Sequence, residues 1–249
     1  MTFEEFRAAQ PTVTVGGKTW FVVEDDMRMN EVRLLQYWQS RVSQATPGRL
    51  LEKLVGGMGP EGRLVRWSPG SVLTYAVLDE HFPSPERAAT IRQAMLEAAS
   101  DWQSVCGVRF QRLDVPEHEA TDRERCLFTV RQHDLSGGLI ALAFFPDDPA
   151  DERDIFVDPT FPATFSARGI LRHELGHILG FYHEFTRHEL DNIDIGEADL
   201  RSVMNYPQHG GDPSLMITDE DARAAREVYG WPVGDSKMVE PPPPDSSTV

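Results

Sequence analysis

The chain contains little cysteine and no long apolar runs. Its 249 residues include only two cysteines, Cys106 and Cys126. Two thiols are too few for the disulfide framework that staples a small secreted domain, and no CxxC spacing suggests that they bind zinc. The sequence leaves open whether they pair with each other or remain two buried thiols. No apolar run approaches the roughly 20 residues that cross a bilayer, so we expect no membrane span.

Basic residues are also scarce. Lysine and arginine together number 24 against 40 aspartates and glutamates, which gives a net charge of −16. This surplus repels a phosphate backbone, so we expect no nucleic-acid partner and a soluble monomer. The first residues, Met1 to Glu5, lack the basic start and apolar stretch of a secretory signal. We therefore expect either a cytoplasmic protein or a secreted one whose signal has been removed.

Breaker residues divide the chain into three parts. Residues 1–62 form a separate small unit that ends in the glycine and proline cluster Gly56–Pro60. Residues 63–232 alternate between strand and helix patterns, as expected of one larger domain. Residues 233–249 contain four consecutive prolines and are predicted to be disordered.

Local patterns predict the helices and strands. Strands are expected at Trp20–Val23, Val72–Leu78, Gly107–Leu113, Cys126–Arg131, Leu139–Phe145 and Asp154–Asp158. Helices are expected at Asn30–Val42, from Ser84 through Trp102, at Ser166–Leu179 and at Asp219–Tyr229. Asn30 and Thr218 are suited to cap the helices that follow them, and Gly180 and Gly230 to end the last two.

The segment from His173 to His183 carries the chemistry. On a helix, His173 and His177 lie one turn apart on the same face, so both imidazoles reach one ion. Gly180 lets the chain leave the helix through a left-handed conformation, after which His183 approaches as a third ligand. Three nitrogens leave a fourth position for water, the arrangement of a catalytic zinc site. Glu174 is placed to hold that water and to act as the general base.

These residues resemble the metzincin clan of zinc endopeptidases, and the details are most similar to the astacin group. The full motif from His173 to His183 is the clan's signature. Glu184 directly after the third histidine, together with Ser202–Tyr206 downstream, is similar to astacins in particular. The resemblance implies that Met204 lies beneath the zinc in the Met-turn. It also implies that Tyr206 is an extra zinc ligand that later stabilises the oxyanion; the alternative is a buried structural tyrosine.

The resemblance also implies an α+β fold, a metzincin-type zincin with a twisted five-stranded mixed sheet, two long helices and a small C-terminal part. Leu139–Asp158 is more similar to the matrixin branch. Leu142 and Phe156 stand where matrixins have histidines for a structural zinc, so we expect one catalytic Zn²⁺ and no second zinc. Leu139–Ala143 is expected to be the sheet edge to which an extended substrate adds as an antiparallel strand, unless a loop covers it. Pro207–Leu215 is expected to shape the pocket beyond the cleaved bond.

Astacin-like precursors are held latent by a prosegment whose aspartate binds the zinc. Val22–Asp26 resembles that element, with Asp26 the better candidate and Asp25 the alternative; a solvated acidic turn is the competing interpretation. By the same resemblance, Glu184 contacts the new N-terminus after activation. Residues 1–62 are thus predicted to be an inhibitory prosegment.

Two functions remain after this reading of the sequence. The first is an astacin-like metalloendopeptidase, made as a zymogen, that hydrolyses proteins or peptides through a zinc-bound water activated by Glu174. The second is a non-catalytic, zinc-stabilised binding protein with a metzincin fold.

Overall fold

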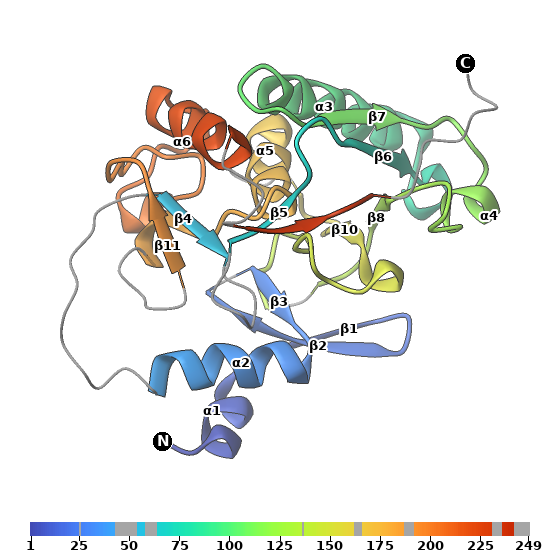
Figure 1. Ribbon diagram of the computed structural model, residues 1–249. Coiled ribbons are helices and arrows are strands. Elements are labelled where there is room, and N and C mark those ends of the chain that lie inside the picture. The colour runs from blue at the N-terminus through green and yellow to red at the C-terminus, as the bar shows by residue number, and fades with distance from the viewer. Residues whose placement is uncertain are drawn as a thin grey trace.

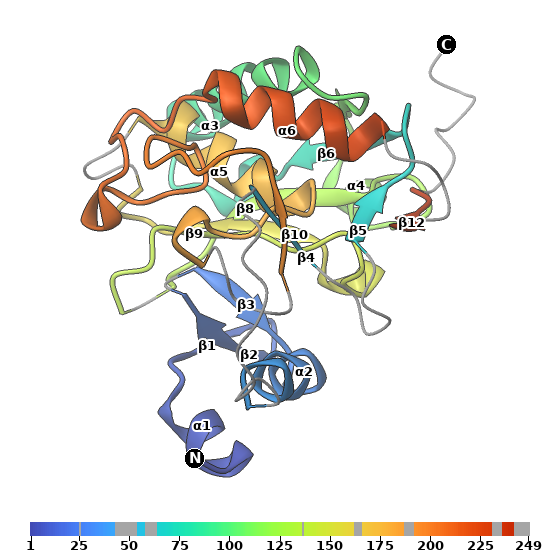
Figure 2. The same cartoon turned by 60° about the vertical axis from the view of Figure 1, so that its left-hand side comes forward.

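The computed structural model describes residues 1–24, 26–42, 54–57, 64–135, 137–161, 166–186, 192–230 and 236–241. Within these residues the strands form a five-stranded sheet, a three-stranded sheet and two strand pairs. The long helices cover one side of the five-stranded sheet, and the N-terminal unit lies against the other (Figure 1 and Figure 2). No helix in this part of the chain is long and apolar enough to cross a membrane.

The five-stranded sheet has the order β7-β6-β8-β10-β9. Its strands are β6 (Val72–Val77), β7 (Arg109–Arg112), β8 (Phe128–Gln132), β9 (Ala141–Leu142) and β10 (Asp154–Val157). Neighbouring strands are parallel except β9, which runs antiparallel to β10 at the edge. The expected mixed five-stranded sheet is therefore confirmed. The predicted strand Leu139–Phe145 pairs with β10 only at Ala141 and Leu142.

Alternation along β10 and β9 gives the sheet two buried faces. Ile155 and Val157 point to the helical side and join the main core, whereas Phe156 points to the opposite side. Ala141 and Leu142 divide in the same way. A sheet whose two faces are both apolar needs a cover on each face.

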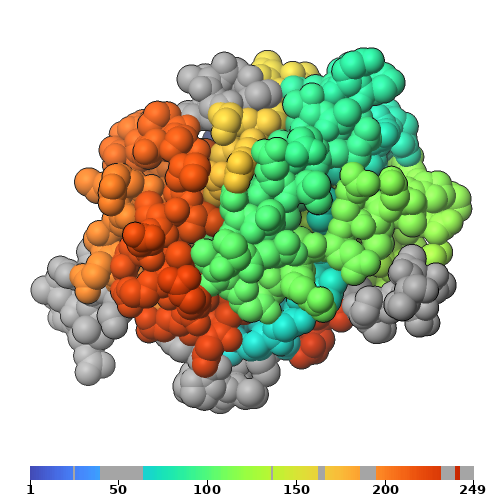
Figure 3. Space-filling view, turned by 90° about the horizontal axis from the view of Figure 1, so that it is seen from above, coloured from blue at the N-terminus to red at the C-terminus, as the bar shows by residue number. Residues whose placement is uncertain are grey.

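The main core lies between the sheet and two long helices, α3 (Pro85–Gln103) and α5 (Ala167–Ile178), as expected. Each helix starts at a serine whose hydroxyl accepts a backbone N–H three residues on, Ser84 for α3 and Ser166 for α5. The last long helix, α6 (Asp219–Gly230), begins at Thr218, which accepts the Asp221 N–H at 3.1 Å. From the helical side, α3 lies beside the C-terminal part of the chain (Figure 3). A short helix, α4 (Glu117–Ala120), lies near the sheet edge.

The N-terminal unit is a three-stranded antiparallel sheet with two helices. It consists of α1 (Phe3–Ala9), β1 (Thr12–Val15), β2 (Lys18–Val23), β3 (Met27–Met29) and α2 (Glu31–Val42). The Asn30 side chain caps α2 as predicted, accepting the Arg33 N–H at 2.9 Å. The sequence analysis found β2 and α2 but missed α1, β1 and β3. The unit's core is completed by Phe145 and Tyr182 from the rest of the chain.

The N-terminal unit covers the second face of the large sheet. Val13, Val15, Trp20 and Val22 pack there against a group that includes Leu142 and Phe156. The Arg28 guanidinium lies 5.1 Å from the centroids of both the Trp20 and Phe156 rings and donates to the carbonyls of Glu152 and Asp154. Leu142 and Phe156, expected to replace structural-zinc histidines, are thus part of an apolar interface.

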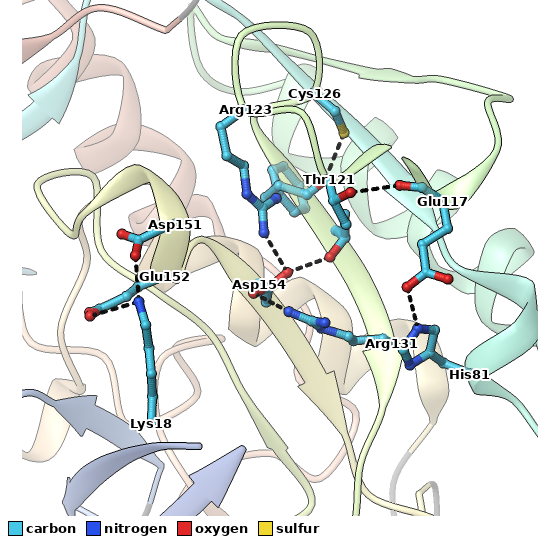
Figure 4. Close-up of polar contacts among 12 residues, drawn as sticks. Lys18, His81, Glu117, Thr121, Arg123, Cys126, Arg131, Asp151, Glu152 and Asp154 are labelled. Atoms are coloured by element: carbon cyan, nitrogen blue, oxygen red, sulfur yellow. Dashed lines mark hydrogen bonds and ion pairs between the residues drawn. The ribbon is translucent and has the colours of Figure 1, made fainter. Parts of the chain in front are cut away.

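Ion pairs surround this apolar interface. Lys18 reaches Asp151 and Glu152, and Asp154 lies between Arg123 and Arg131 (Figure 4). Arg131 Nη2 is 2.6 Å from Asp154 Oδ2, and Asp154 is almost fully buried. Burial alone raises the pKa of Asp154, but the charges of Arg123 and Arg131 outweigh it and lower the pKa.

Two strand pairs cross the predicted part boundaries. β4 (Leu54–Gly57), inside the predicted N-terminal part, pairs antiparallel with β11 (Asn192–Ile195). β12 (Ser236–Val239), inside the segment predicted to be disordered, pairs parallel with β5 (Leu64–Trp67). The glycine and polar residues of these segments indicated breaks in secondary structure. Strand pairing uses backbone N–H and C=O groups, however, and needs no particular side chain. The other residues of the predicted tail lie largely outside the described ranges.

Cys106 and Cys126 are free thiols, so the pairing alternative is wrong. Cys126 is buried and Cys106 partly so. Burial raises the pKa of each to about 11, which keeps both protonated and unreactive at neutral pH.

Replacement of Gly180 by alanine tests how tightly the end of α5 is fixed. Gly180 has φ +96°, and a Cβ there would overlap the Val65 carbonyl oxygen. Gly70 has a similar φ of +83° but open space around it. We expect Gly70→Ala to cost about 1–2 kcal/mol, as a left-handed residue does, and Gly180→Ala to cost clearly more. Thermal unfolding of both variants measures the difference; equal losses would contradict the close packing.

Candidate metal site

The α5 helix brings two imidazoles together, and the turn after it brings the third. His173, His177 and His183 are buried, and His173 Nε2 lies 3.2 Å from His183 Nε2. Gly176, between the first two histidines, packs so closely on the Met204 thioether that a Cβ there would overlap the sulfur. Met204 therefore forms a floor under the helix at the level of the imidazoles.

Side-chain donors from three other elements hold α5. Trp67 Nε1 donates to the Ile178 carbonyl at 2.7 Å, and the Tyr229 hydroxyl donates to the Leu179 carbonyl at 2.9 Å. Carbonyls at a helix end have no partner within the helix, so these two donors fix the last turn. In the middle of the helix, Trp102 Nε1 donates to the Arg172 carbonyl at 2.8 Å, one residue before the first histidine.

The backbone sets which imidazole nitrogen faces the common point. His173 Nδ1 is 2.7 Å from the Val203 carbonyl oxygen, and His177 Nδ1 is 2.8 Å from the Phe181 carbonyl oxygen. A carbonyl only accepts, so both Nδ1 atoms carry the proton and both Nε2 atoms are left with a lone pair. This is the tautomer that binds a metal through Nε2.

Asp221 fixes the loop that orients His173. Its buried carboxylate accepts hydrogen bonds from the Ser202 hydroxyl at 2.6 Å and the Val203 N–H at 2.9 Å. The Val203 carbonyl in turn accepts the hydrogen bond of His173 Nδ1–H. Burial raises the pKa of Asp221, and the hydrogen bonds only partly offset this. The sequence analysis missed Asp221, because an aspartate in the first turn of a helix is common for reasons of the helix dipole alone.

Asp26 reaches the three imidazoles from the N-terminal unit. Its Oδ1 lies 2.9 Å from His183 Nε2 and 3.4 Å from His177 Nε2, and its Oδ2 lies 3.3 Å from His173 Nε2. Among the described residues, these four side chains are the only group of three or more histidines, cysteines or acidic residues whose ligand atoms share one point, within 4.8 Å of one another. Asp25, the alternative candidate, lies outside the described residues.

A second acidic side chain of the same turn contacts the third histidine. Glu24 Oε2 is 3.3 Å from His183 Nδ1, and Glu24 Oε1 accepts the Tyr37 hydroxyl at 2.6 Å. Glu24 adopts φ +51°, which is uncommon for a residue with a side chain. The sequence analysis missed this contact because nothing in the letters separates a solvated glutamate from one directed inwards.

The environment of the site shifts the pKa values of its side chains in different directions. Burial lowers the pKa of His183, but the carboxylates of Asp26 and Glu24 outweigh it and raise the pKa to about 10. Burial alone raises the pKa of Asp26, yet the His183 charge and the imidazole contacts hold it well below its usual range. Burial lowers the pKa of His177 to about 4. The His183 imidazolium thus faces the carboxylates of both Asp26 and Glu24.

Tyr206 stands beside the imidazoles. Its hydroxyl donates a hydrogen bond to Asp26 Oδ2, and its ring lies 5.1 Å from the His173 ring and 4.9 Å from the His183 ring. A cavity of about 220 Å³ opens next to it, lined by His173, Glu174 and Tyr206 and by the apolar side chains of Leu139, Ile170 and Leu215. The cavity includes Pro207, Gln208 and Leu215 of the predicted pocket segment Pro207–Leu215.

Glu174 is buried with one carboxylate oxygen, Oε2, that has no hydrogen-bond partner among the described residues. Burial, with the nearby charge of Asp26, raises its pKa well above the ordinary value. The buried His177 Nε2 likewise has no hydrogen-bond partner among the described residues. Buried polar atoms are nearly always paired, and an unpaired imidazole nitrogen within a group of three histidines and one aspartate fits a divalent cation of nitrogen and oxygen preference such as Zn²⁺.

The described histidines outside this group have other partners. His81 pairs with Glu117 at 2.9 Å, and His133 contacts the Thr14 carbonyl. His209 stacks on Phe185 with ring centroids 4.1 Å apart. Glu184, expected to meet a new N-terminus, is buried and accepts the Asp199 N–H at 3.1 Å.

Replacement of Glu174 by glutamine tests the electrostatic cost of the site. Because its pKa is raised, Glu174 destabilises the metal-free protein where a free glutamate ionises, from about pH 4.5 upwards. Glu174→Gln should therefore raise the Tm of metal-free protein at about pH 7, by roughly 2–4 °C per kcal/mol relieved. The gain should vanish at about pH 4, where both side chains are neutral. Exposed Glu80→Gln is the control, and a gain independent of pH would contradict the argument.

A family model described as matrixin, a peptidase family, matches residues 66–230. No protein among those with curated descriptions matches the sequence. Two solved structures of myroilysin are similar to the chain, each at 14% identity. One has a TM-score of 0.49 and covers 72% of this chain and 100% of the other; the second has a TM-score of 0.47 and covers 73% and 100%. The family match spans the five-stranded sheet, α5 and the three histidines of the site. The chain therefore belongs to the matrixin family of zinc-dependent metallopeptidases.

Proposed function

We propose that this protein is a zinc endopeptidase in which His173, His177 and His183 bind the metal and Glu174 is the general base. The single observation that carries the proposal is the convergence of three Nε2 atoms on one buried point beside a glutamate oxygen without a partner. Three protein nitrogens leave room for a reacting group, as a catalytic zinc site requires and a closed structural site does not.

Glu174 and Tyr206 have different roles in the reaction. When bound, zinc supplies a Lewis acid that polarises the scissile carbonyl and acidifies water. Glu174 takes a proton from the attacking water on its carboxylate and passes it to the leaving amine. The Tyr206 hydroxyl, next to the cavity, donates a hydrogen bond to the developing oxyanion. The raised pKa of Glu174 suits a group that must both accept and return a proton.

The cleft favours an extended peptide as substrate. Strand β9 is the sheet edge beside the imidazoles, and a substrate adding to it antiparallel gains backbone hydrogen bonds whatever its side chains. The apolar cavity of about 220 Å³ then receives the side chain that follows the cleaved bond.

We further propose that the N-terminal unit keeps the enzyme latent in the astacin manner. Asp26 occupies the point to which the imidazoles converge and also engages the Tyr206 hydroxyl. Met27 forms a parallel bridge with Ala143 beyond β9, so the inhibitory segment runs opposite to the polarity expected of a substrate. Its peptide bonds are therefore not presented to Glu174 for cleavage.

Loss of the Glu174 carboxylate tests the enzymatic proposal. In protein cut between α2 and β4, Glu174→Gln should retain one zinc per chain and lose peptide cleavage by at least about 10²-fold. Elemental analysis and peptide turnover measure the two effects, with His177→Ala as the variant that loses the metal. Equal turnover by wild type and Glu174→Gln would instead favour the zinc-stabilised binding protein.

Removal of the Asp26 carboxylate tests latency. Asp26→Asn weakens the contact with the imidazoles while keeping the size of the side chain, so the uncut variant should cleave peptides faster than the uncut wild type. Cleavage of the chain within residues 43–53 should release more activity and leave β4 in place on β11. If neither Asp26→Asn nor cleavage within residues 43–53 raises the rate of peptide hydrolysis, the N-terminal unit has no inhibitory role.

A further inference from the structure

Arg33 of the N-terminal unit is held at a second place beside the cleft. Its Nη2 lies 2.7 Å from Asp147 Oδ1, its Nη1 contacts Asp148, and its guanidinium carbon is 4.8 Å from the centroid of the Phe145 ring. All three charged side chains are largely buried, each 15% exposed or less. Two carboxylates and an aromatic face match the planar fork of a guanidinium better than the point charge of an ammonium.

The groups that receive Arg33 are shaped by the body of the protein. The Phe145 N–H donates to Asp148 Oδ2 at 2.8 Å, and the Asp148 N–H donates to the Phe145 carbonyl at 2.9 Å. Arg153 Nε holds the Asp148 carbonyl at 3.1 Å. One carboxylate oxygen of Asp148 is thus used to fix the turn, and the other is directed at the guanidinium.

This receptor lies at a defined end of the cleft. The Phe145 ring is 5.3 Å from the His177 ring and 4.8 Å from the Tyr182 ring. The apolar cavity lies at the other end of the edge strand, against Leu139 and Ala141. A peptide antiparallel to the strand has its N-terminal side where the strand has its C-terminal side. Phe145 therefore faces the substrate residues that precede the cleaved bond.

We propose that Phe145, Asp147 and Asp148 form a binding subsite for an arginine side chain of the substrate, N-terminal to the cleaved bond. The proposal rests on the proposed function, in which the N-terminal unit leaves and Arg33 with it. Asp147 and Asp148 then lose the Arg33 guanidinium, and a substrate guanidinium restores the pairing that Arg33 provides in the latent chain.

The first experiment tests the receptor in the uncut chain, whether or not the chain is an enzyme. Arg33→Ala empties the receptor, and methylguanidinium at millimolar concentration is the probe. We expect it to raise the Tm of Arg33→Ala but not of the wild type, whose receptor is filled, nor of Arg33→Ala/Asp147→Asn. Methylammonium is the control for charge alone. Equal effects of the two cations, or the same effect on all three proteins, would overturn the proposal.

The second experiment tests the use of the receptor by substrates. The full chain is cut between α2 and β4, and peptides are compared in which one arginine, or its neutral isostere citrulline, is moved through the positions before the cleaved bond. We expect kcat/KM to favour arginine at one position by on the order of tenfold, as for a hydrogen bond to a charged group.

Matched variants test whether the preference for arginine depends on Asp147. Asp147→Asn should remove the preference for arginine, whereas Asp151→Asn on the same loop, which pairs with Lys18, should keep it. Equal cleavage of arginine and citrulline peptides at every position would overturn the subsite. If no peptide is cleaved at all, the proposed function fails, and the methylguanidinium result decides the receptor by itself.

Discussion

The contact between Asp26 and three buried imidazoles is the constraint on which the described arrangement depends. A carboxylate and an imidazolium are costly to bury alone, and each is tolerable here because the other is within 3 Å. To bring Asp26 to that point, the turn after β2 must lie over the cleft, which requires the three-stranded sheet to dock beside it. The apolar packing of Trp20 on Phe156 and the ion pairs of Lys18 and Arg33 serve this placement.

The N-terminal unit contacts the rest of the chain at several separate places. Asp26 and Glu24 contact the imidazoles, Arg28 lies against two aromatic rings, and Arg33 lies against the loop between β9 and β10. That loop is rich in carboxylates, and the unit meets it with basic side chains. Charge complementarity in an otherwise acidic chain therefore gives the unit one defined orientation.

The sequence predicted the parts of the molecule that follow from local rules. The helical spacing of His173 and His177, the Asn30 and Thr218 caps and the central strands required only near neighbours, and these elements are confirmed. The family resemblance supplied the mixed sheet and the Met-turn. The family match is to matrixins, and the predicted astacin subgroup is not confirmed. The motif from His173 to His183 belongs to the whole clan and does not separate the two groups.

Contacts between distant segments could not be read from the letters. Glu24 on His183, Asp221 on Val203 and Arg33 on Asp148 join residues whose spacing carries no period, and each looks like an ordinary surface charge. The strand pairs β4–β11 and β12–β5 were missed for a related reason: backbone pairing leaves little trace in side chains.

The second apolar face of the large sheet has a consequence for biosynthesis. Leu142 and Phe156 require a cover, and the hairpin of β1 and β2 that supplies it precedes them in the chain by more than a hundred positions. The hairpin is therefore synthesised before the strands that it covers. The second face of the sheet can be covered as soon as it forms, and its apolar surface is not exposed to neighbouring chains.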